Sequence, residues 1–295
     1  MALHPAIIAR RALCYIAAMS ATLFPLTAPL SIGEVLDAGF RLFRATVLAC
    51  LPFATFAVIA GQLPGIYSVS QGRPPGSFTP GDLPWVAVNV ASALLTVALV
   101  GAIFVQQHRV AAGASRSMRV ALAMALRRVA VAVGLVLLLA FGLAVVGALA
   151  TMLSRVLGTA WVVMVLAPLL AWAGVSVLFA WPAVLVEGSS IRSALRSSLA
   201  LVSGNRLRTA LILLVALAAV LALYSIAVIV GIVIATLLGS ADLAFVTAVT
   251  NVLLVVLGAF GVPFYTALIL AAYEDLKVRR QGSDLERRIE NLGAS

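Results

Sequence analysis

Residues that could carry out acid–base or metal chemistry are scarce in this chain. Its 295 residues include 10 Asp and Glu, 2 His and 2 Cys. His108 stands beside Arg109 in a basic stretch, which predicts a solvated residue at a membrane surface, and no cluster has the spacing of metal ligands. Cys14 and Cys50 lie far apart in the sequence and form no disulfide framework. The sequence therefore predicts no catalytic, cofactor-binding or metal-binding residue, and a protein that is not an enzyme.

The composition indicates a membrane protein. Apolar residues make up 63% of the chain and charged residues 10%, which is more apolar surface than a soluble protein could hide. Six segments lack charged residues and histidine, and each exceeds the roughly 20 residues that a helix needs to cross the hydrocarbon. These predicted spans are 46–67, 85–106, 129–153, 160–186, 209–238 and 243–273. We expect an all-α polytopic fold: a poorly ordered extension over 1–30, a six-helix membrane domain over 31–276, and a charged cytoplasmic tail over 277–295.

Basic residues are distributed very unequally between the two sides of these spans. Of the 20 Lys and Arg residues, 18 fall on one side, whereas only Arg73 and Arg155 fall on the other. Because short loops rich in Lys and Arg stay in the cytoplasm, both termini are predicted to be cytoplasmic in a bacterial inner membrane. The predicted partners are the lipid bilayer, its anionic headgroups at this basic face, and a membrane protein. Nucleic acid and cofactors are not expected.

A helical pattern recurs on the cytoplasmic side before the first, third and fifth spans. Its three copies begin at Ser31, Ser117 and Ser190. The apolar face comprises Ile32, Val35, Leu36, Phe40 and Phe43 in the first copy, Met118, Ala121, Leu122, Leu126 and Val129 in the second, and Ile191, Ala194, Leu195, Leu199 and Val202 in the third. One further position on this face, which we call the small-residue slot, holds a small side chain in each copy: Gly39, Ala125 and Ser198. The pattern predicts three interfacial amphipathic helices, each followed by a transmembrane hairpin. A true threefold repeat and a chance match both remain open.

Inside the predicted spans the polar side chains are amides and hydroxyls. The main ones are Gln62, Asn89, Ser92, Ser176, Ser225, Thr250 and Asn251. Asn89 and Asn251 are the strongest candidates for a functional polar patch, and interhelical hydrogen bonding is the alternative. Glu187 is expected to accept hydrogen bonds at the start of the helix that follows it.

Short sequence signals also predict helix starts, bends and contacts. Capping boxes predict helix starts at Ser31 with Glu34 and at Ser283 with Glu286. Bends are predicted at Pro168, Pro182 and Pro263. Small-residue pairs predict close helix contacts at Ala57 and Gly61, Gly147 and Thr151, and Gly231 and Ala235.

Three stretches of the chain together resemble one family. They are SIGEVLDAGFRLFR at 31–44, VEGSSIRSALRSSLALVSG at 186–204 and YEDLKVRRQGSDLE at 273–286. Over residues 27–290 the chain resembles the bacterial six-helix proteins named after the membrane domain of glycerophosphoryl diester phosphodiesterase. Lys277, Gln281 and Ser283 depart from the arginine, glutamate and aromatic residue of that pattern.

The resemblance implies an integral inner-membrane protein and no enzymatic activity. In the phosphodiesterases, catalysis belongs to a separate soluble barrel domain with paired histidines and metal-binding carboxylates. These 295 residues hold neither that barrel nor those side chains. Most stand-alone members of the family lack an assigned molecular role, so no functional residues come with the resemblance.

Two functions therefore remain open. The first is a non-enzymatic scaffold or accessory module that docks partners or lipids through its cytoplasmic helices. The second is a permease or lipid-handling transporter with an uncharged pathway between the hairpins, which the prolines and the repeat favour. A polar cavity near Asn89 or Asn251 would distinguish the second from the first.

Overall fold

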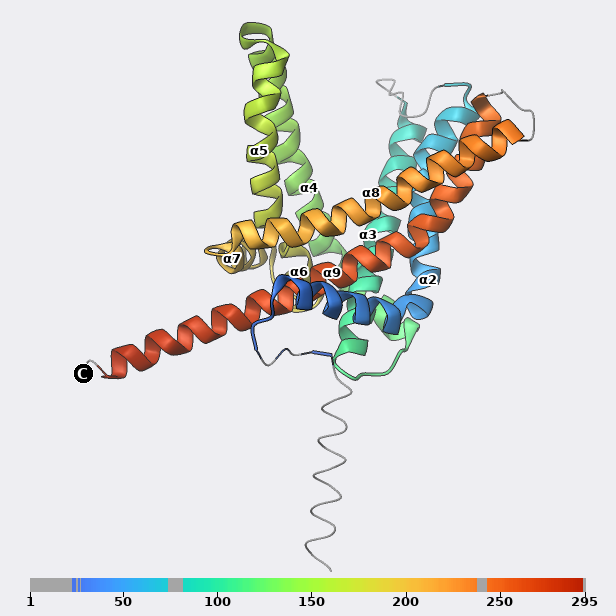
Figure 1. Ribbon diagram of the computed structural model, residues 1–295. Helices are drawn as coiled ribbons and strands as arrows, with labels where there is room; N and C mark the ends of the chain where they lie inside the picture. Colours follow the sequence, from blue (N-terminus) through green and yellow to red (C-terminus); the bar gives the residue numbers. More distant parts are fainter. Residues whose placement is uncertain (1–22, 25, 27, 74–81, 238–242, 294–295) are drawn as a thin grey trace, which may run out of the picture.

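The computed structural model describes residues 23–24, 26, 28–73, 82–237 and 243–293 (Figure 1). Eight α-helices and no strand occur in these residues. The helices are α2 (Ile32–Ser70), α3 (Leu83–Ala111), α4 (Met118–Leu157), α5 (Thr159–Val177), α6 (Ala180–Leu185), α7 (Ile191–Val202), α8 (Arg206–Leu237) and α9 (Leu243–Gly293). The prediction of an all-α protein is confirmed.

Within the described residues, six helical stretches are long and apolar enough to cross a membrane, as predicted. They are Ile32–Ser70, Leu83–Ala111, Met118–Val156, Thr159–Leu185, Arg206–Ile234 and Val249–Gly282. Many large apolar side chains on them are exposed; Leu137, Phe141 and Leu214, for example, are 64%, 70% and 60% exposed. A surface of this kind would be unfavourable in water but suits contact with lipid. The chain is therefore a multi-pass membrane protein.

The helices differ from the predicted segments at their ends. α2 and α4 each join a predicted interfacial segment and the following span in one helix. α9 continues through the predicted tail to Gly293, so the capping box at Ser283 does not begin a separate helix. The residues from 274 to 281 are mostly good helix formers with no Gly or Pro to stop the helix. The fourth span is divided instead, since α5 ends at Val177 and α6 begins at Ala180.

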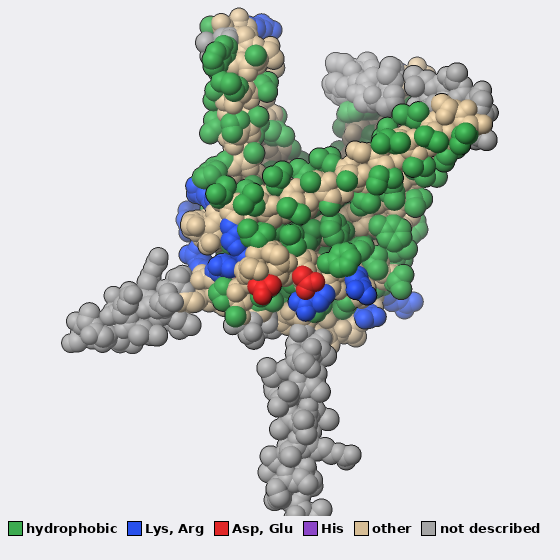
Figure 2. All heavy atoms as spheres, viewed as in Figure 1, with side chains coloured by type: hydrophobic (Ala, Val, Ile, Leu, Met, Phe, Trp, Pro, Cys, Tyr) green, Lys and Arg blue, Asp and Glu red, His purple; other side chains and the backbone are tan. Residues whose placement is uncertain are grey.

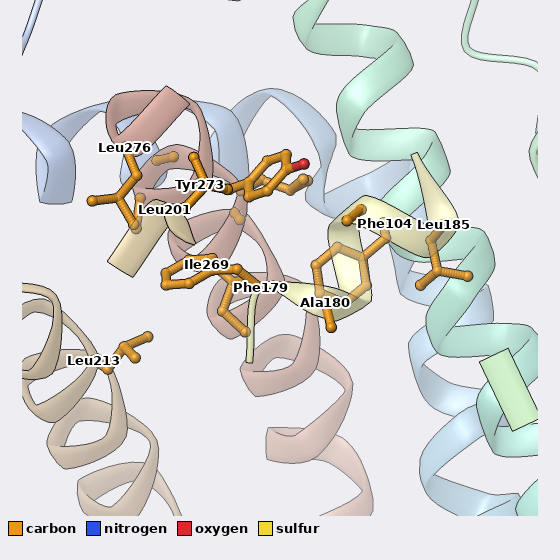
Figure 3. Close-up of a cluster of buried hydrophobic side chains, with 14 of the residues drawn as sticks. Phe104, Phe179, Ala180, Leu185, Leu201, Leu213, Ile269, Tyr273 and Leu276 are labelled. Atoms are coloured by element: carbon orange, nitrogen blue, oxygen red, sulfur yellow. The ribbon is translucent and has the colours of Figure 1, made fainter. Parts of the chain in front are cut away.

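α9 lies at the centre of the fold. It packs against α2, α8, α3 and α7, and Figure 1 shows α8 and α9 running obliquely side by side. α2 also packs against α3, and α3 against α4. Buried side chains from α3, α6, α7, α8 and α9 meet in one cluster (Figure 3), where the rings of Phe179 and Tyr273 stack with centroids 6.2 Å apart. We call the end of the molecule where α3 ends and α2, α7 and α8 begin the basic end, because Arg and Lys side chains gather there.

α4 and α5 stand apart from the other long helices (Figure 1). They pack against each other, and 11% and 17% of the residues in their apolar windows are buried, against 44% in α3 and α9. Gly158, at a φ of 84°, forms the tight connection between them. Glycine is favoured in this backbone conformation because it has no Cβ atom. Most of the surface of the α4–α5 pair is therefore available to lipid.

The described part of the predicted N-terminal extension is packed rather than loose. The backbone N–H groups of Leu23 and Phe24 donate to the carbonyl oxygen of Ala111, at 2.9 and 3.1 Å, and Phe24 is 2% exposed. This stretch therefore closes over the end of α3. The prediction for Cys14, and those for the side chains of the tail from Ser283 onward, lie outside the described residues.

The small-residue pairs do not all mark close contacts. A Cβ atom added at Gly231 would lie 3.2 Å from the Cα atom of Thr250, so α8 and α9 approach closely there, as predicted. A Cβ atom at Gly61 or Gly147 would meet nothing within 4 Å, so the prediction is wrong at these two positions. Both glycines lie on exposed faces of their helices. A small residue allows two helices to approach closely, but it does not by itself determine which face of its helix contacts another helix.

Candidate functional site

A fully buried carboxylate organises the basic end. Asp275 of α9 is 0% exposed and accepts hydrogen bonds from the backbone N–H of Leu30 (2.8 Å), from Nε of Arg279 (3.1 Å) and from Nη1 of Arg208. Both arginines also donate to the carbonyl oxygen of Leu30. The network joins α8, α9 and the chain before α2, and it neutralises a charge that would otherwise be costly to bury.

A second polar cluster involves Tyr273 and Lys277, which lie two residues before and after Asp275 on α9. Nζ of Lys277 lies 2.9 Å from Oε1 of Glu187 and 5.5 Å from the centroid of the Tyr273 ring. His108, at the end of α3, is half-buried and within electrostatic range of both Lys277 and Glu187. Its Nδ1 atom is buried and has no hydrogen-bond partner among the described residues. The cluster thus connects α3, α9 and the turn before α7.

Two residues of this cluster have surroundings that differ from those predicted from the sequence. Glu187 was expected to cap the helix that follows it, but it pairs with Lys277. The hydroxyl of Ser190 accepts the hydrogen bond from the Ser193 N–H at the start of α7. His108 was expected to be solvated, yet it is half-buried, and Lys277 and Glu187 lie within electrostatic range of it. Within the described part of the chain, no three His, Cys, Asp or Glu residues are placed to hold a metal ion.

Two glutamines at the end of α3 were not among the polar candidates of the sequence. Gln106 and Gln107 are both fully buried, and Nε2 of Gln107 donates to the carbonyl oxygen of Pro263 in α9 (2.7 Å). The amide atoms of Gln106 have no partner among the described residues. Because neighbouring residues point about 100° apart on a helix, other elements must surround this end of α3 on two sides. Adjacent amides at the end of a span were the signal that could have identified them.

The polar residues predicted within the spans mostly bond locally. Oγ of Ser92 donates to the carbonyl oxygen of Ala60 (2.6 Å) and so links α3 to α2. Nδ2 of Asn89 donates to the carbonyl oxygen of Trp85 in its own helix, and Asn251 lies on an exposed face of α9. The hydrogen bond of Asn89 is local to α3 and is therefore not the interhelical bond of the alternative, and the exposed position of Asn251 does not decide between the two roles.

The three segments that begin at Ser31, Ser117 and Ser190 bury and expose corresponding positions. Three residues at one position are 0% exposed: Val35, Ala121 and Ala194. The small-residue slot is also buried in each copy, at Gly39, Ala125 and Ser198. The next residue is about half exposed in each copy, at 47% for Phe40, 50% for Leu126 and 47% for Leu199. The small slots are places of close approach: a Cβ atom at position 39 would lie 2.5 Å from a leucine side chain of α9, and Oγ of Ser198 donates to a carbonyl oxygen of α5 (2.7 Å).

A groove of about 470 Å³ runs between α7 and α9 at the basic end. It is lined by Ser193, Arg196, Ser197, Ala200 and Leu201 of α7 and by Arg280 of α9. Two arginines and two serines thus line this space, and none of the described lining residues carries a carboxylate. Figure 2 shows Arg and Lys side chains gathered in this part of the surface, beneath the α4–α5 pair.

Comparisons with known proteins assign the chain to no family. No family model, curated protein or solved structure matches it. The resemblance carried by residues 31–44, 186–204 and 273–286 therefore stays a prediction. What these residues build is a membrane protein whose polar side chains are concentrated at one end, around the buried part of α9.

Proposed function

We propose that the protein is a bacterial inner-membrane protein with both termini in the cytoplasm, acting without catalysis as a scaffold or accessory module. Its basic end would face the cytoplasm and dock lipids or a membrane protein partner there. The strong excess of Lys and Arg at this end supports the orientation. The ionisable groups of α9 support a structural role, because Asp275 and Lys277 are both held by partners from other elements.

The observation that carries this proposal is the common exposure of the three repeated segments. Phe40, Leu126 and Leu199 each leave an apolar side chain about half exposed, beside a face that is fully buried. A helix that buries one apolar stripe and presents another beside arginines is suited to the boundary between headgroups and acyl chains. We infer that the three segments are interfacial amphipathic helices of an internal repeat, each leading into a transmembrane hairpin.

A permease with an uncharged pathway is the second candidate. One observation favours it: the α4–α5 pair stands apart from the other long helices, as a moving element would. The hydrogen bonds favour the scaffold, since Asn89 and Ser225 bond within their own helices instead of lining a polar path.

Spin-label depth measurements test the interfacial assignment. Single cysteines would be placed at Phe40, Leu126 and Leu199 in a background in which both native cysteines are replaced, and the labelled protein would be reconstituted in bilayers. Asp37, whose side chain is 64% exposed, serves as the aqueous control, and Leu214, 60% exposed on α8, as the hydrocarbon control. All three labels should report one shared depth between the controls, about 5–10 Å into the headgroup boundary.

Two outcomes would contradict the proposal. If the three labels reported three different depths, or a depth equal to that of Leu214, the segments would not be interfacial copies of one unit. Docking itself would be excluded if purification in mild detergent repeatedly yielded the protein with neither a partner nor enriched anionic lipid.

A further inference from the structure

The groove between α7 and α9 has the composition of a phosphate-binding site. Of the six described residues that line it, two are arginines, two are serines and none is acidic. Guanidinium groups present N–H donors in a planar fork that matches phosphate oxygens, and serine hydroxyls can donate to the same oxygens. A carboxylate in the lining would repel an anion, and none of the described lining residues carries one.

The helical geometry brings these donors to one place. Ser193 and Ser197 are four residues apart on α7 and therefore lie on the same side of that helix, with Arg196 next to them. Arg280 reaches the groove from α9, so the two guanidinium groups come from different helices. Ser193 also lies in the first turn of α7, where the helix dipole favours a negative charge.

The surroundings of the groove indicate a lipid rather than a soluble phosphate. Ala200 and Leu201 add apolar surface to the lining, and Leu199 of the same helix is 47% exposed. At the start of α8, the guanidinium carbon of Arg206 lies 4.8 Å from the ring centroid of Trp172 in α5. Arginine side chains at the ends of membrane spans typically lie at the headgroup level, and Arg206 is the first residue of α8.

We propose that this groove binds the phosphate of an anionic phospholipid headgroup in the cytoplasmic leaflet. The inference rests on the proposed function, because it requires the basic end to face the cytoplasm, and it deepens that function by assigning a site. An anionic headgroup such as that of phosphatidylglycerol fits better than a zwitterionic one, since the charged side chains among the described lining residues are both arginines, which would repel a choline ammonium. The headgroup hydroxyls of phosphatidylglycerol are additional partners for the two serines.

Native mass spectrometry of the full-length protein in mild detergent tests the site. Phosphatidylglycerol, phosphatidylcholine or inorganic phosphate would be titrated onto the wild type and onto Arg196→Gln, Arg280→Gln and the double variant Ser193→Ala/Ser197→Ala. Arg192→Gln is the matched control, because Arg192 is exposed on α7 but does not line the groove. The thermal midpoint and size-exclusion profile of each variant would show that it is folded.

Phosphatidylglycerol should bind the wild type in preference to the other two probes. Each groove arginine variant should lose about tenfold or more in affinity, because a charge-assisted hydrogen bond is removed. The serine double variant should lose about threefold or more with its net charge unchanged, and Arg192→Gln should lose less than about twofold, as a solvent-exposed charge contributes little.

Different failures have different meanings. If Arg192→Gln weakened binding as much as the groove variants while the serine variant did not, attraction would be general and the site would be excluded, although the proposed function would stand. If inorganic phosphate bound as tightly as the lipid, the lipid assignment would be wrong. If no variant differed and no anionic lipid bound at all, both the site and lipid docking by the basic end would be refuted.

Discussion

Asp275→Asn tests whether the buried network holds the basic end together. Asp275 is fully buried, and its partners Arg208 and Arg279 have side chains 18% and 28% exposed. The substitution keeps the size of the side chain but removes its charge, which leaves two guanidinium groups with little solvent and no counter-ion. Removing one partner of a buried ion pair costs about 3–5 kcal/mol of stability.

Asp37→Asn is a matched control in the same protein. Asp37 pairs with Arg41 at 3.2 Å, but both side chains are more than half exposed. An exposed pair four residues apart on a helix contributes about 0.3–0.5 kcal/mol. The loss in free energy of unfolding should therefore be roughly tenfold larger for Asp275→Asn than for Asp37→Asn.

The thermal midpoint of the detergent-solubilised protein measures this difference. At about 2–4 °C per kcal/mol, Asp275→Asn should lower the midpoint by roughly 6–20 °C and Asp37→Asn by no more than about 2 °C. If Asp275→Asn lowered the midpoint no further than Asp37→Asn, the network would not stabilise the fold and the reasoning would be wrong.

Three further predictions concern helix contact, pH and orientation. Gly39→Val should destabilise the protein by about 1–3 kcal/mol, as overpacking does, because a Cβ atom there would lie 2.5 Å from a side chain of α9. Gly33→Ala, with open space around it, should change the thermal midpoint little. The backbone N–H of Trp85 and the guanidinium of Arg73 hold the pKa of Asp82 below its usual range. The stabilisation that these two partners give to ionised Asp82 is therefore present at neutral pH and lost as the pH falls below about 4. In Asp82→Asn, the thermal midpoint should fall less steeply as the pH is lowered into this range. A reporter fused to the C-terminus should be active only if it functions in the cytoplasm; activity of a periplasmic reporter there would reverse the orientation.

The sequence allowed the spans to be predicted because their signal is local. A charge-free segment such as 85–106 has the length and composition of a span wherever it folds. The end of α9 was harder to predict, since the loss of hydrophobicity near Tyr273 suggested a tail although the following residues are good helix formers. Hydrophobicity marks where the membrane ends, and helix propensity marks where the helix ends. The two boundaries differ here.

The candidate site could not be predicted because its contacts join distant parts of the chain. Leu30 and Asp275 are 245 positions apart, and Glu187 and Lys277 are 90 positions apart. A sequence pattern describes one segment at a time, so the position of Glu187 indicated only a capping role for the helix that follows it. The small slot at Gly39 was identifiable, because a repeated helical face left one position that only a small side chain filled in each copy.

The network around Asp275 has a consequence for biosynthesis. Leu30 and Arg208 both bond to the Asp275 carboxylate of α9, so neither contact can form until the ribosome has synthesised that helix. At about 5–20 residues per second, the first helix waits in the bilayer for roughly ten seconds or more before its partner emerges. A nascent chain stopped before α9 would expose unpaired arginine at the membrane surface, where quality-control proteases could distinguish it from the finished protein.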